Sequence, residues 1–242
     1  MEIKKITIPK GNGKIRKVVS VDTESKNKLR ELLPELEKIV ETLDTENLIF
    51  GFRYGKNPVL NAFQHIGFKY SLSMDLENFF DYVRPEHVQS IVSKKIIDYC
   101  FIDDRAPQGL PTSPAIANLA LIQSDKAIFR EINKISSDIV YTRYADDLTI
   151  SFNDYRILPK ISFLVNQIVS KNGFKINENK TKFQSLGNGR IIVTGIGVDR
   201  HGLHPTRKTL KKLRAAQHQG NILSKKGLFE WAECKLPKKI VS

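Results

Sequence analysis

The chain has 242 residues, enough to bury one large core or two closely joined subdomains. Lys and Arg number 39 against 26 Asp and Glu, so the formal net charge is +13, which favours a polyanionic partner, nucleic acid first. The two distant cysteines, Cys100 and Cys234, exclude a disulfide scaffold and a cysteine-based zinc site. Glu2, Lys4 and Lys5 follow Met1 at once, so we expect no signal peptide. No apolar run approaches about 18 residues, so we expect no membrane partner and a cytoplasmic location.

The first part of the chain predicts a basic β-hairpin and two helices. Residues 3–22 alternate short apolar runs with a Gly/Lys turn, which is typical of a hairpin. Its cations are compatible with a plain solvated turn or with contact to a triphosphate or nucleic-acid backbone. Apolar residues at helical spacing predict a helix over roughly 24–43, bent by Pro34. A shorter helix is expected to carry Asn61 and His65.

The middle of the chain predicts a strand and two helices around an irregular loop. A buried strand is expected to end at Asp75, with a turn that holds Phe80 after it. A helix is predicted from residue 85 through about 99. Three prolines and a glycine make residues 103–114 an irregular loop. A long helix over about 114–133 follows, with small residues that allow close packing against a sheet.

Residues 139–151 read as two short strands with two adjacent carboxylates, Asp146 and Asp147, at the bend between them. Aspartate favours turns, so the pair alone does not indicate a function. Two negative charges side by side are nevertheless unfavourable unless a cation lies near them. The hairpin is therefore a candidate metal site whose interpretation depends on the rest of the chain.

The last third predicts a helix, two β segments and a basic helix. Residues 155–173 read as a helix ended by Asn-Gly, and residues 174–183 as a short strand with a basic turn. Residues 190–199 resemble a glycine-broken hairpin. Residues 205–219 form a strongly basic helix, whose charged face is either solvated or bound to nucleic acid. A short helix and a loose end are expected in the tail.

Three aspartates follow from this layout as one candidate site. The helix between Asp75 and the Asp146-Asp147 hairpin lets their strands become neighbours, so three carboxylates converge on one sheet edge. Mg²⁺ takes few protein oxygens and keeps its other positions for water and phosphates. Two such ions about 4 Å apart stabilise the attacking and leaving oxygens of an in-line phosphoryl displacement. In a basic chain this predicts nucleotidyl transfer, with a nuclease or a nucleotide cyclase as alternatives.

The order of the motifs resembles that of reverse transcriptases. Motifs A, B and C of that family, and two signatures of its retron branch, match this chain over about residues 6–215. The matching residues are Asp75 with Phe79-Phe80, then Gln108-Gly109-Leu110-Pro111-Thr112-Ser113-Pro114, then Tyr144-Ala145-Asp146-Asp147, with Asn61-Ala62-Phe63-Gln64-His65 and Val193-Thr194-Gly195 as the retron signatures. The chain is therefore similar to a retron-type bacterial reverse transcriptase.

The resemblance implies an α+β, right-hand polymerase fold. Fingers are expected over 1–70 with part of 85–112, a ferredoxin-like palm over 71–202, and a short helical thumb with the C-terminal tail over 203–242. The thumb is short for a retron enzyme. Another defence-associated or unclassified bacterial reverse transcriptase therefore stays an alternative.

The resemblance also assigns roles to individual residues. Asp75, Asp146, Asp147 and Lys180 are the implied catalytic residues, and Asp75, Asp146, Asp147 and the carbonyl of Leu76 the implied metal ligands. The implied nucleotide-binding residues are Lys10, Arg16, Phe80, Gln108 and Gly109, of which Phe80 selects dNTP by clashing with a 2′-OH. The implied RNA-binding residues are Asn61, His65, Val193, Thr194, Gly195, Arg207, Lys211 and Arg214.

The implied function is an RNA-directed DNA polymerase that copies part of a cognate structured RNA into DNA by a two-metal mechanism, in antiviral defence. The implied cofactors are two Mg²⁺ ions, with Mn²⁺ as a substitute. The implied partners are a cognate non-coding RNA template, the DNA product, dNTPs and an effector protein. A non-catalytic RNA-binding scaffold with the same fold is the alternative from another class, and an RNA-dependent RNA polymerase is a third interpretation, against which Phe80 and Ala145 argue.

Overall fold

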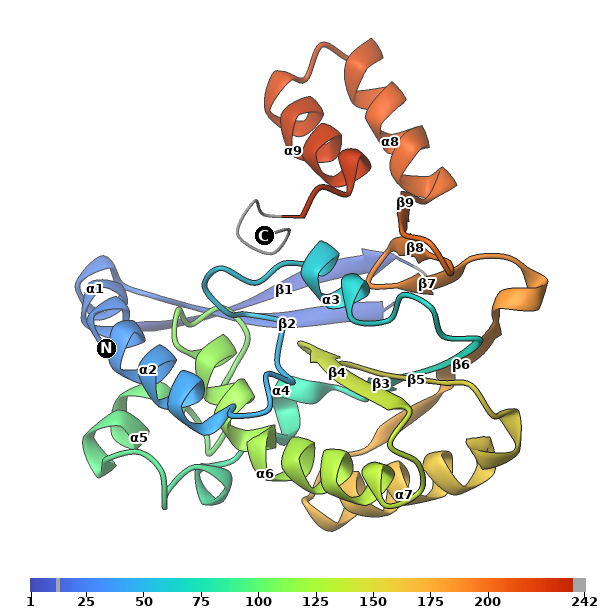
Figure 1. The fold of residues 1–242 in the computed structure, drawn as a ribbon. Helices are drawn as coiled ribbons and strands as arrows, with labels where there is room; N and C mark the ends of the chain where they lie inside the picture. The colour runs from blue at the N-terminus through green and yellow to red at the C-terminus, as the bar shows by residue number, and fades with distance from the viewer. Residues whose placement is uncertain (12–13, 237–242) are drawn as a thin grey trace.

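The computed structural model describes residues 1–11 and 14–236. A central antiparallel sheet lies over two long helices, and a long β-hairpin lies beside the sheet (Figure 1). A pair of C-terminal helices stands at the end of the molecule opposite the two long helices. Within the described ranges, no helix combines the length and the apolar character needed to span a bilayer.

The central sheet has the strand order β4-β5-β3-β6, and all its neighbouring strands are antiparallel. The longest helix between β3 and β4 and the helix between β5 and β6 give the order strand, helix, two strands, helix, strand for the main elements along the chain. This arrangement is the ferredoxin-like topology. The elements are β3 (Tyr70–Leu76), α6 (Ser113–Asn133), β4 (Ile139–Tyr144), β5 (Asp147–Phe152), α7 (Leu158–Lys171) and β6 (Ile176–Ser185).

Helices α6 and α7 cover the same face of this sheet (Figure 1). Small residues on α6, among them Ala115, Ala117 and Ala120, are buried and allow the close approach that the sequence predicts. Met74 and Leu76 of β3, with Leu148 and Ile150 of β5, belong to the same core as these alanines. The predicted long helix and the predicted hairpin at residues 139–151 are therefore confirmed.

The basic N-terminal segment forms the predicted hairpin of β1 (Ile3–Gly11) and β2 (Lys14–Val21). The single helix predicted over 24–43 is wrong in one respect, because it is two helices, α1 (Thr23–Glu31) and α2 (Leu33–Leu43). Pro34 lies in the first turn of α2, where its missing N–H costs least. The proline therefore begins a new helix instead of bending an old one.

The helix predicted from residue 85 to about 99 is also wrong. A short 3₁₀ turn (Pro85–His87) and the helix α5 (Lys94–Cys100) are separate elements. Ser93 has the extended backbone of an N-cap, with φ −67° and ψ 154°, so it starts a new helix. The apolar residues between the 3₁₀ turn and α5 still face the core, so their spacing in the sequence resembles that of a helix.

Two short helices complete the part before α6. They are α3 (Pro58–Phe63), which carries Asn61, and α4 (Phe79–Tyr82), which follows β3. Helix α3 packs against the β4 side of the central sheet and against the small sheet described next.

A second, smaller core lies under the C-terminal part. It is built on the three-stranded sheet β7 (Ile191–Val193), β8 (Ile196–Val198) and β9 (Leu203–Pro205). Helices α8 (Arg207–His218) and α9 (Ile222–Glu233) follow as a hairpin that stands above this sheet in Figure 1. Cys234, directly after α9, is buried in the second core and ties the end of the helical hairpin back to the sheet.

Candidate active site

The fold brings three aspartates from two parts of the chain to one end of the central sheet. Asp75 near the end of β3 is the register partner of Asp147, the first residue of β5. Asp146 precedes it in the turn, and its carbonyl accepts a 2.9 Å hydrogen bond from the Leu76 amide. The predicted convergence therefore rests on the backbone pairing of two adjacent antiparallel strands.

The turn itself is tight and strained. Tyr144 pairs with Asp147 across it, so Ala145 and Asp146 form a two-residue loop. Ala145 has φ 59°, in the left-handed region that a residue with a side chain rarely adopts. Such a conformation costs on the order of 1–3 kcal/mol and persists only when its surroundings enforce it.

A buried arginine provides part of that enforcement. Arg143 is fully buried, and its Nη1 donates to the Ala145 carbonyl at 3.1 Å and to Asn118 Oδ1 at 2.9 Å. Its Nε and Nη2 donate to the Asp125 carboxylate at 2.8–3.0 Å. Tyr141 also donates its hydroxyl to that carboxylate at 2.6 Å. Helix α6 thus holds the turn through a closed network of charged hydrogen bonds.

A glycine in a preceding loop packs directly on the same turn. A Cβ placed on Gly51 would lie 2.1 Å from the Ala145 nitrogen, a distance that no side chain tolerates. The Gly51 carbonyl accepts a 3.0 Å hydrogen bond from Asn118, which links the loop to the network around Arg143. The turn is therefore fixed from both sides.

The electrostatics of the site show the crowding of negative charge. Burial, together with the charges of Asp146 and Asp75, raises the pKa of Asp147 to about 6. Lys180 on β6 opposes this effect, because its Nζ lies 2.8 Å from both carboxylate oxygens of Asp75. The hydrogen bond to Asp75 raises the pKa of Lys180, which keeps the ammonium charged. An internal cation therefore partly balances the aspartates.

The donor set fits a hard divalent cation. Carboxylate oxygens are the ligands that Mg²⁺ and similar ions prefer, and three such carboxylates lie together here. Among the described residues, no three His, Cys, Asp or Glu side chains already form a ligand shell. The Asp75 carboxylate is instead turned to Lys180, so a metal ion would share or replace that ion pair.

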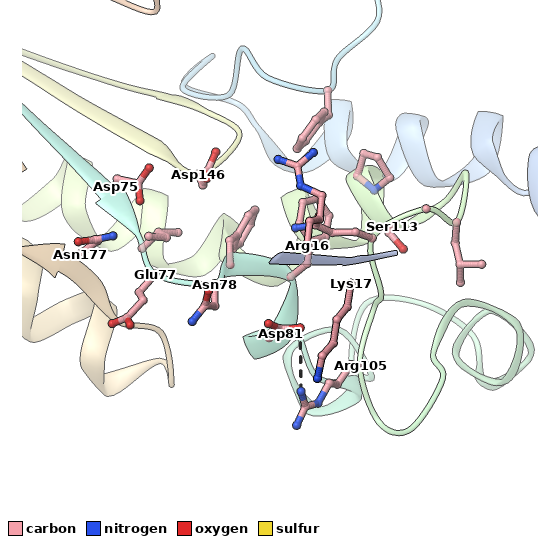
Figure 2. Close-up of a pocket in the computed structure, with 18 of the residues that line it drawn as sticks. Arg16, Lys17, Asp75, Glu77, Asn78, Asp81, Arg105, Ser113, Asp146 and Asn177 are labelled. Atoms are coloured by element: carbon pink, nitrogen blue, oxygen red, sulfur yellow. Dashed lines mark ion pairs between the residues drawn. The ribbon is translucent and has the colours of Figure 1, made fainter. Parts of the chain in front are cut away.

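A large hollow opens in front of the aspartates. It has a volume of about 1120 Å³, and Asp75, Asp146 and Lys180 line it. Figure 2 shows Asp75 and Asp146 on one side and Arg16 of β2 on the other. Phe80, Gln108 and Gly109 line the same hollow, so the structure brings together all but one of the predicted nucleotide-binding residues. The side chain of Lys10 lies outside the described part of the structure.

The Gln108-Gly109 pair anchors the hairpin over this hollow. The Gln108 carbonyl accepts a 2.7 Å hydrogen bond from the Val19 amide of β2. Gly109 has φ 111°, and a Cβ there would lie 2.1 Å from the Val19 carbonyl oxygen. The glycine is therefore needed for close approach of two backbones, and it places β2 with Arg16 across from the aspartates.

A smaller hollow adjoins the same turn. It has a volume of about 380 Å³ and is lined by Asp147, whereas Asp146 lines the larger one. Lys180 lines both. Thr194 and Gly195 of the predicted RNA-binding set line this hollow together with Asp147.

The structure does not support direct RNA contact by three other members of that set. Asn61, His65 and Val193 have no exposed surface, so each acts inside the fold. The His65 ring nitrogens bind the Ser151 and Thr142 hydroxyls at 2.9 and 2.7 Å, which ties α3 to β4 and β5. Burial lowers the pKa of His65 to about 3, so the ring is neutral. Asn61, His65 and Val193 are therefore packing residues, and the prediction that they contact RNA directly is wrong.

The remaining three members lie on an open surface. Arg207, Lys211 and Arg214 are exposed on α8, and their placement is compatible with either solvent or a nucleic-acid backbone.

Several residues of the site were missed in the sequence. Asp125 and Asn118 looked like ordinary members of a long helix, and Gly51 like part of an aromatic loop. Arg143 carried a usable signal, since it is a lone charge in a strand of apolar and aromatic residues. Trp231, far along the chain on α9, lines the smaller hollow, and nothing in its neighbourhood indicated that position.

Comparison with known proteins agrees with this geometry. The model of the family described as reverse transcriptase (RNA-dependent DNA polymerase) matches residues 8–223. The Retron Ec86 reverse transcriptase of Escherichia coli is 30% identical over 192 residues, covering 76% of this chain and 59% of that protein. The Retron Mx162 reverse transcriptase of Myxococcus xanthus is 27% identical, covering 88% and 51%. The chain thus spans between half and three fifths of the length of these relatives.

Solved structures show the same fold. The apo telomerase of Candida tropicalis, truncated from its C-terminal domain, superposes with a TM-score of 0.59 at 14% identity, covering 84% of this chain and 54% of that one. A foamy viral protease-reverse transcriptase bound to double-stranded DNA has a TM-score of 0.57 at 18% identity, covering 95% and 37%. The expected right-hand polymerase fold is therefore confirmed, and the chain belongs to the reverse transcriptase family, within which it is similar to the retron-type bacterial enzymes.

Proposed function

We propose that this protein is an RNA-directed DNA polymerase of retron type, which extends a primer with dNTPs along an RNA template. The observation that carries the proposal is the position of Asp75, Asp146 and Lys180 in the same hollow as Arg16, with Asp147 beside them. The hollow is large enough for a nucleotide and its template. The similarity to retron enzymes over most of the chain supports the same activity.

The residues act mainly by positioning and electrostatics. Arg16 faces the triphosphate from β2, held there by the contact between Val19 and Gln108. Phe80 lies against Phe52 and Phe79, with ring centroids at 6.1 and 5.3 Å, so its ring is supported as a wall against a 2′-OH. Lys180, held protonated, can give a proton to the leaving pyrophosphate. Such positioning accounts for most of the rate enhancement in phosphoryl transfer.

Asp75, Asp146 and Asp147, with the carbonyl of Leu76, are the residues that would hold two Mg²⁺ ions, with Mn²⁺ as a substitute. When bound, the ions supply charge stabilisation at the attacking and leaving oxygens. A cation there would also offset the burial and the charges of Asp146 and Asp75, which together raise the pKa of Asp147.

We assign the fingers to residues 1–70 with part of 85–112, the palm to 71–202, and the short thumb to 203 onward. The β1–β2 hairpin over the larger hollow and the α8–α9 hairpin beside the smaller one support this division. Helix α3 is the exception in its contacts, since it packs on the palm and on the β7–β9 sheet.

A cognate structured RNA, part of which is copied into DNA, is the proposed template. The exposed cations Arg207, Lys211 and Arg214 on α8 support an RNA-binding role for the thumb. A cytoplasmic location and a defence role with an effector protein belong to the same proposal. Sequencing nucleic acid that co-purifies with the protein tests the retron assignment: RNA joined to its DNA copy is expected, and its absence from protein that extends primers would indicate another branch of the family.

Primer extension on an RNA template with Mg²⁺ and dNTPs tests the activity. The double variant Asp146→Asn with Asp147→Asn should lose more than about 10³-fold in rate, because the charge that holds the metal is gone. A matched double variant of surface aspartates, Asp98→Asn with Asp138→Asn, should keep wild-type activity. Equal extension by wild type and the site variant would contradict the proposed function.

A further inference from the structure

Phe52 has a backbone conformation that bulky residues rarely adopt. Its φ is 57°, in the left-handed region where glycine is usual. Such strain persists only where the surrounding structure enforces it, and it gathers at functional sites. Phe52 also lines the larger hollow, so the strained backbone places an aromatic ring where the nucleotide is proposed to bind.

A buried carboxylate closes the loop that carries Phe52. Asp44 accepts hydrogen bonds from the Leu48 and Ile49 amides at 2.8 and 3.2 Å. It accepts another from Arg53 Nη1 at 3.0 Å, and the side chains of this ion pair are only 3% and 11% exposed. Because both charges are shielded from water, opening the pair would leave a buried charge without a partner. The position directly after Phe52 is therefore held firmly.

The position directly before Phe52 is attached to the catalytic turn. Gly51 packs on the backbone of Ala145, and its carbonyl accepts a 3.0 Å hydrogen bond from Asn118 of α6. Phe52 thus has a fixed neighbour on each side, Gly51 and Arg53, and its left-handed backbone is enforced from both directions.

The ring of Phe52 borders Phe80, the residue proposed to clash with a 2′-OH. The two ring centroids lie 6.1 Å apart with an interplanar angle of 54°, within the range of aromatic pairs. Phe80 also pairs with Phe79 at 5.3 Å, and Phe79 is 3% exposed and belongs to the main core. Phe80 therefore meets one ring that is fixed in the core and one ring, 41% exposed, that the loop presents.

We propose that Phe52 is a positioning residue for the exclusion of ribonucleotides, because its ring holds Phe80 in the rotamer that clashes with a 2′-OH. This inference rests on the proposed function, in which Phe80 selects dNTP. A clash discriminates only when the residue that causes it cannot move aside, since a ring that changes rotamer freely makes room for the hydroxyl. The enforced backbone at Phe52 supplies that immobility from the loop side.

Single-nucleotide incorporation measures the effect. Phe52→Ala should lower the ratio of kcat/KM for dNTP and rNTP about 2- to 10-fold, the range that corresponds to the loss of one aromatic pair. The change should come from a higher kcat/KM for rNTP, whereas a loss of stability alone would lower the values for both nucleotides. Phe52→Tyr keeps the ring and should keep the wild-type ratio. The matched control is Tyr54→Ala, which removes a 93% exposed ring from the same loop, outside the hollow, and should also keep it.

A double-mutant cycle with Phe80→Ala tells whether Phe52 acts through Phe80. If it does, adding Phe52→Ala to Phe80→Ala should leave the ratio at the value of Phe80→Ala alone. Effects that multiply would mean that Phe52 contacts the nucleotide or its template by itself, and would overturn the proposal. A wild-type ratio in Phe52→Ala would overturn it as well.

Phe52→Gly separates the ring from the strained backbone. Glycine adopts the left-handed conformation freely, so this variant should unfold at a higher denaturant concentration than Phe52→Ala. It lacks the ring as Phe52→Ala does, and should lose the preference for dNTP to the same extent. A glycine variant that keeps the wild-type preference would contradict the role of the ring, and one no more stable than Phe52→Ala would contradict the enforced strain.

Failure of the proposed function gives a different result from failure of this inference. A wild type that extends no primer, or a Phe80→Ala variant with the wild-type ratio, would contradict the assignments on which the inference rests, and the inference with them. A preference for dNTP that Phe80→Ala relaxes and Phe52→Ala does not would contradict the inference alone.

Discussion

Two ion pairs near the turn between β4 and β5 differ in what surrounds them. Arg143 of β4 and Asp125 of α6 form a pair whose side chains are 0% and 1% exposed. Asp75 of β3 pairs with Lys180 of β6, whose side chain is 57% exposed. Both pairs have a shortest distance of 2.8 Å, so geometry alone does not distinguish them.

Their surroundings do distinguish them. Every charged group of the buried pair has further partners in Asn118, Tyr141 and the Ala145 carbonyl, so the pair cannot open without leaving buried charge unpaired. Lys180 is held by Asp75 and is open to water on its other side. The first pair is a permanent part of the scaffold, and the second can exchange its partner during a reaction. This contrast predicts which changes reduce stability and which reduce activity.

The largest expected effect is on the buried pair. Arg143→Met leaves Asp125 buried without its cation, and should lower the free energy of unfolding by about 3–5 kcal/mol. Chemical denaturation measures it. The matched control is Arg156→Met, which breaks an exposed pair with Asp154 and should cost less than about 1 kcal/mol. Equal losses in the two variants would contradict the distinction drawn between buried and exposed pairs.

The second prediction concerns the exchangeable pair. Lys180→Gln should leave stability nearly unchanged but lower kcat about 10²-fold or more, because the proposed proton donor is lost. It should also lower the Mg²⁺ concentration needed for half-maximal rate, since the Asp75 carboxylate no longer has a competing cation. Lys175→Gln, which removes a surface lysine paired with Glu77, is the control. Loss of a purely structural lysine would not lower kcat and at the same time lower the Mg²⁺ concentration needed for half-maximal rate.

The third prediction extends the contrast to pH. Because burial lowers the pKa of His65 to about 3, the unfolded chain binds a proton below pH 6.5 and the folded chain does not. The free energy of unfolding should therefore fall by about 1.4 kcal/mol per pH unit from roughly pH 6.5 downward, until the pH reaches the folded pKa. His65→Gln should remove this component, measured by denaturation at several pH values. Exposed His201→Gln is the control, and the same slope in wild type and His65→Gln would refute the assignment.

The smallest effect is expected at the wall of the larger hollow. Phe80→Ala should shift the ratio of kcat/KM for dNTP and rNTP about tenfold toward rNTP, because the clash with the 2′-OH is relieved. Single-nucleotide incorporation measures it. Phe163→Ala removes an exposed ring on α7 and should leave the ratio as it is. An unchanged ratio of kcat/KM for dNTP and rNTP in Phe80→Ala would contradict the proposed role of Phe80 in selecting dNTP.

Much of the site was predictable because its chemistry requires particular residue types at the end of particular strands. The three aspartates fall into this class, since the predicted strands place them together, and the resemblance to reverse transcriptases added Lys180 and the Gln108-Gly109 pair. The supporting network around Arg143 was not predictable, because Asn118 and Asp125 sit on a helix whose periodicity says only that one face is buried. Trp231 was not predictable for a different reason: tertiary contacts of α9 with β9 and Gly195, and the burial of Cys234 in the second core, bring it to the smaller hollow.

The contact between Gly51 and the Ala145-Asp146 turn restricts how the sequence can evolve. Any side chain at position 51 would collide with the backbone of Ala145, so a descendant that gains one must also rebuild the loop that presents Asp146. Because Phe52 follows directly and its ring lies against that of Phe80, such a change would also disturb the residue proposed to select the sugar. We therefore expect the residues at positions 51, 52, 80 and 145 to covary among relatives. A substitution at one of these positions should be tolerated only with a compensating substitution at another.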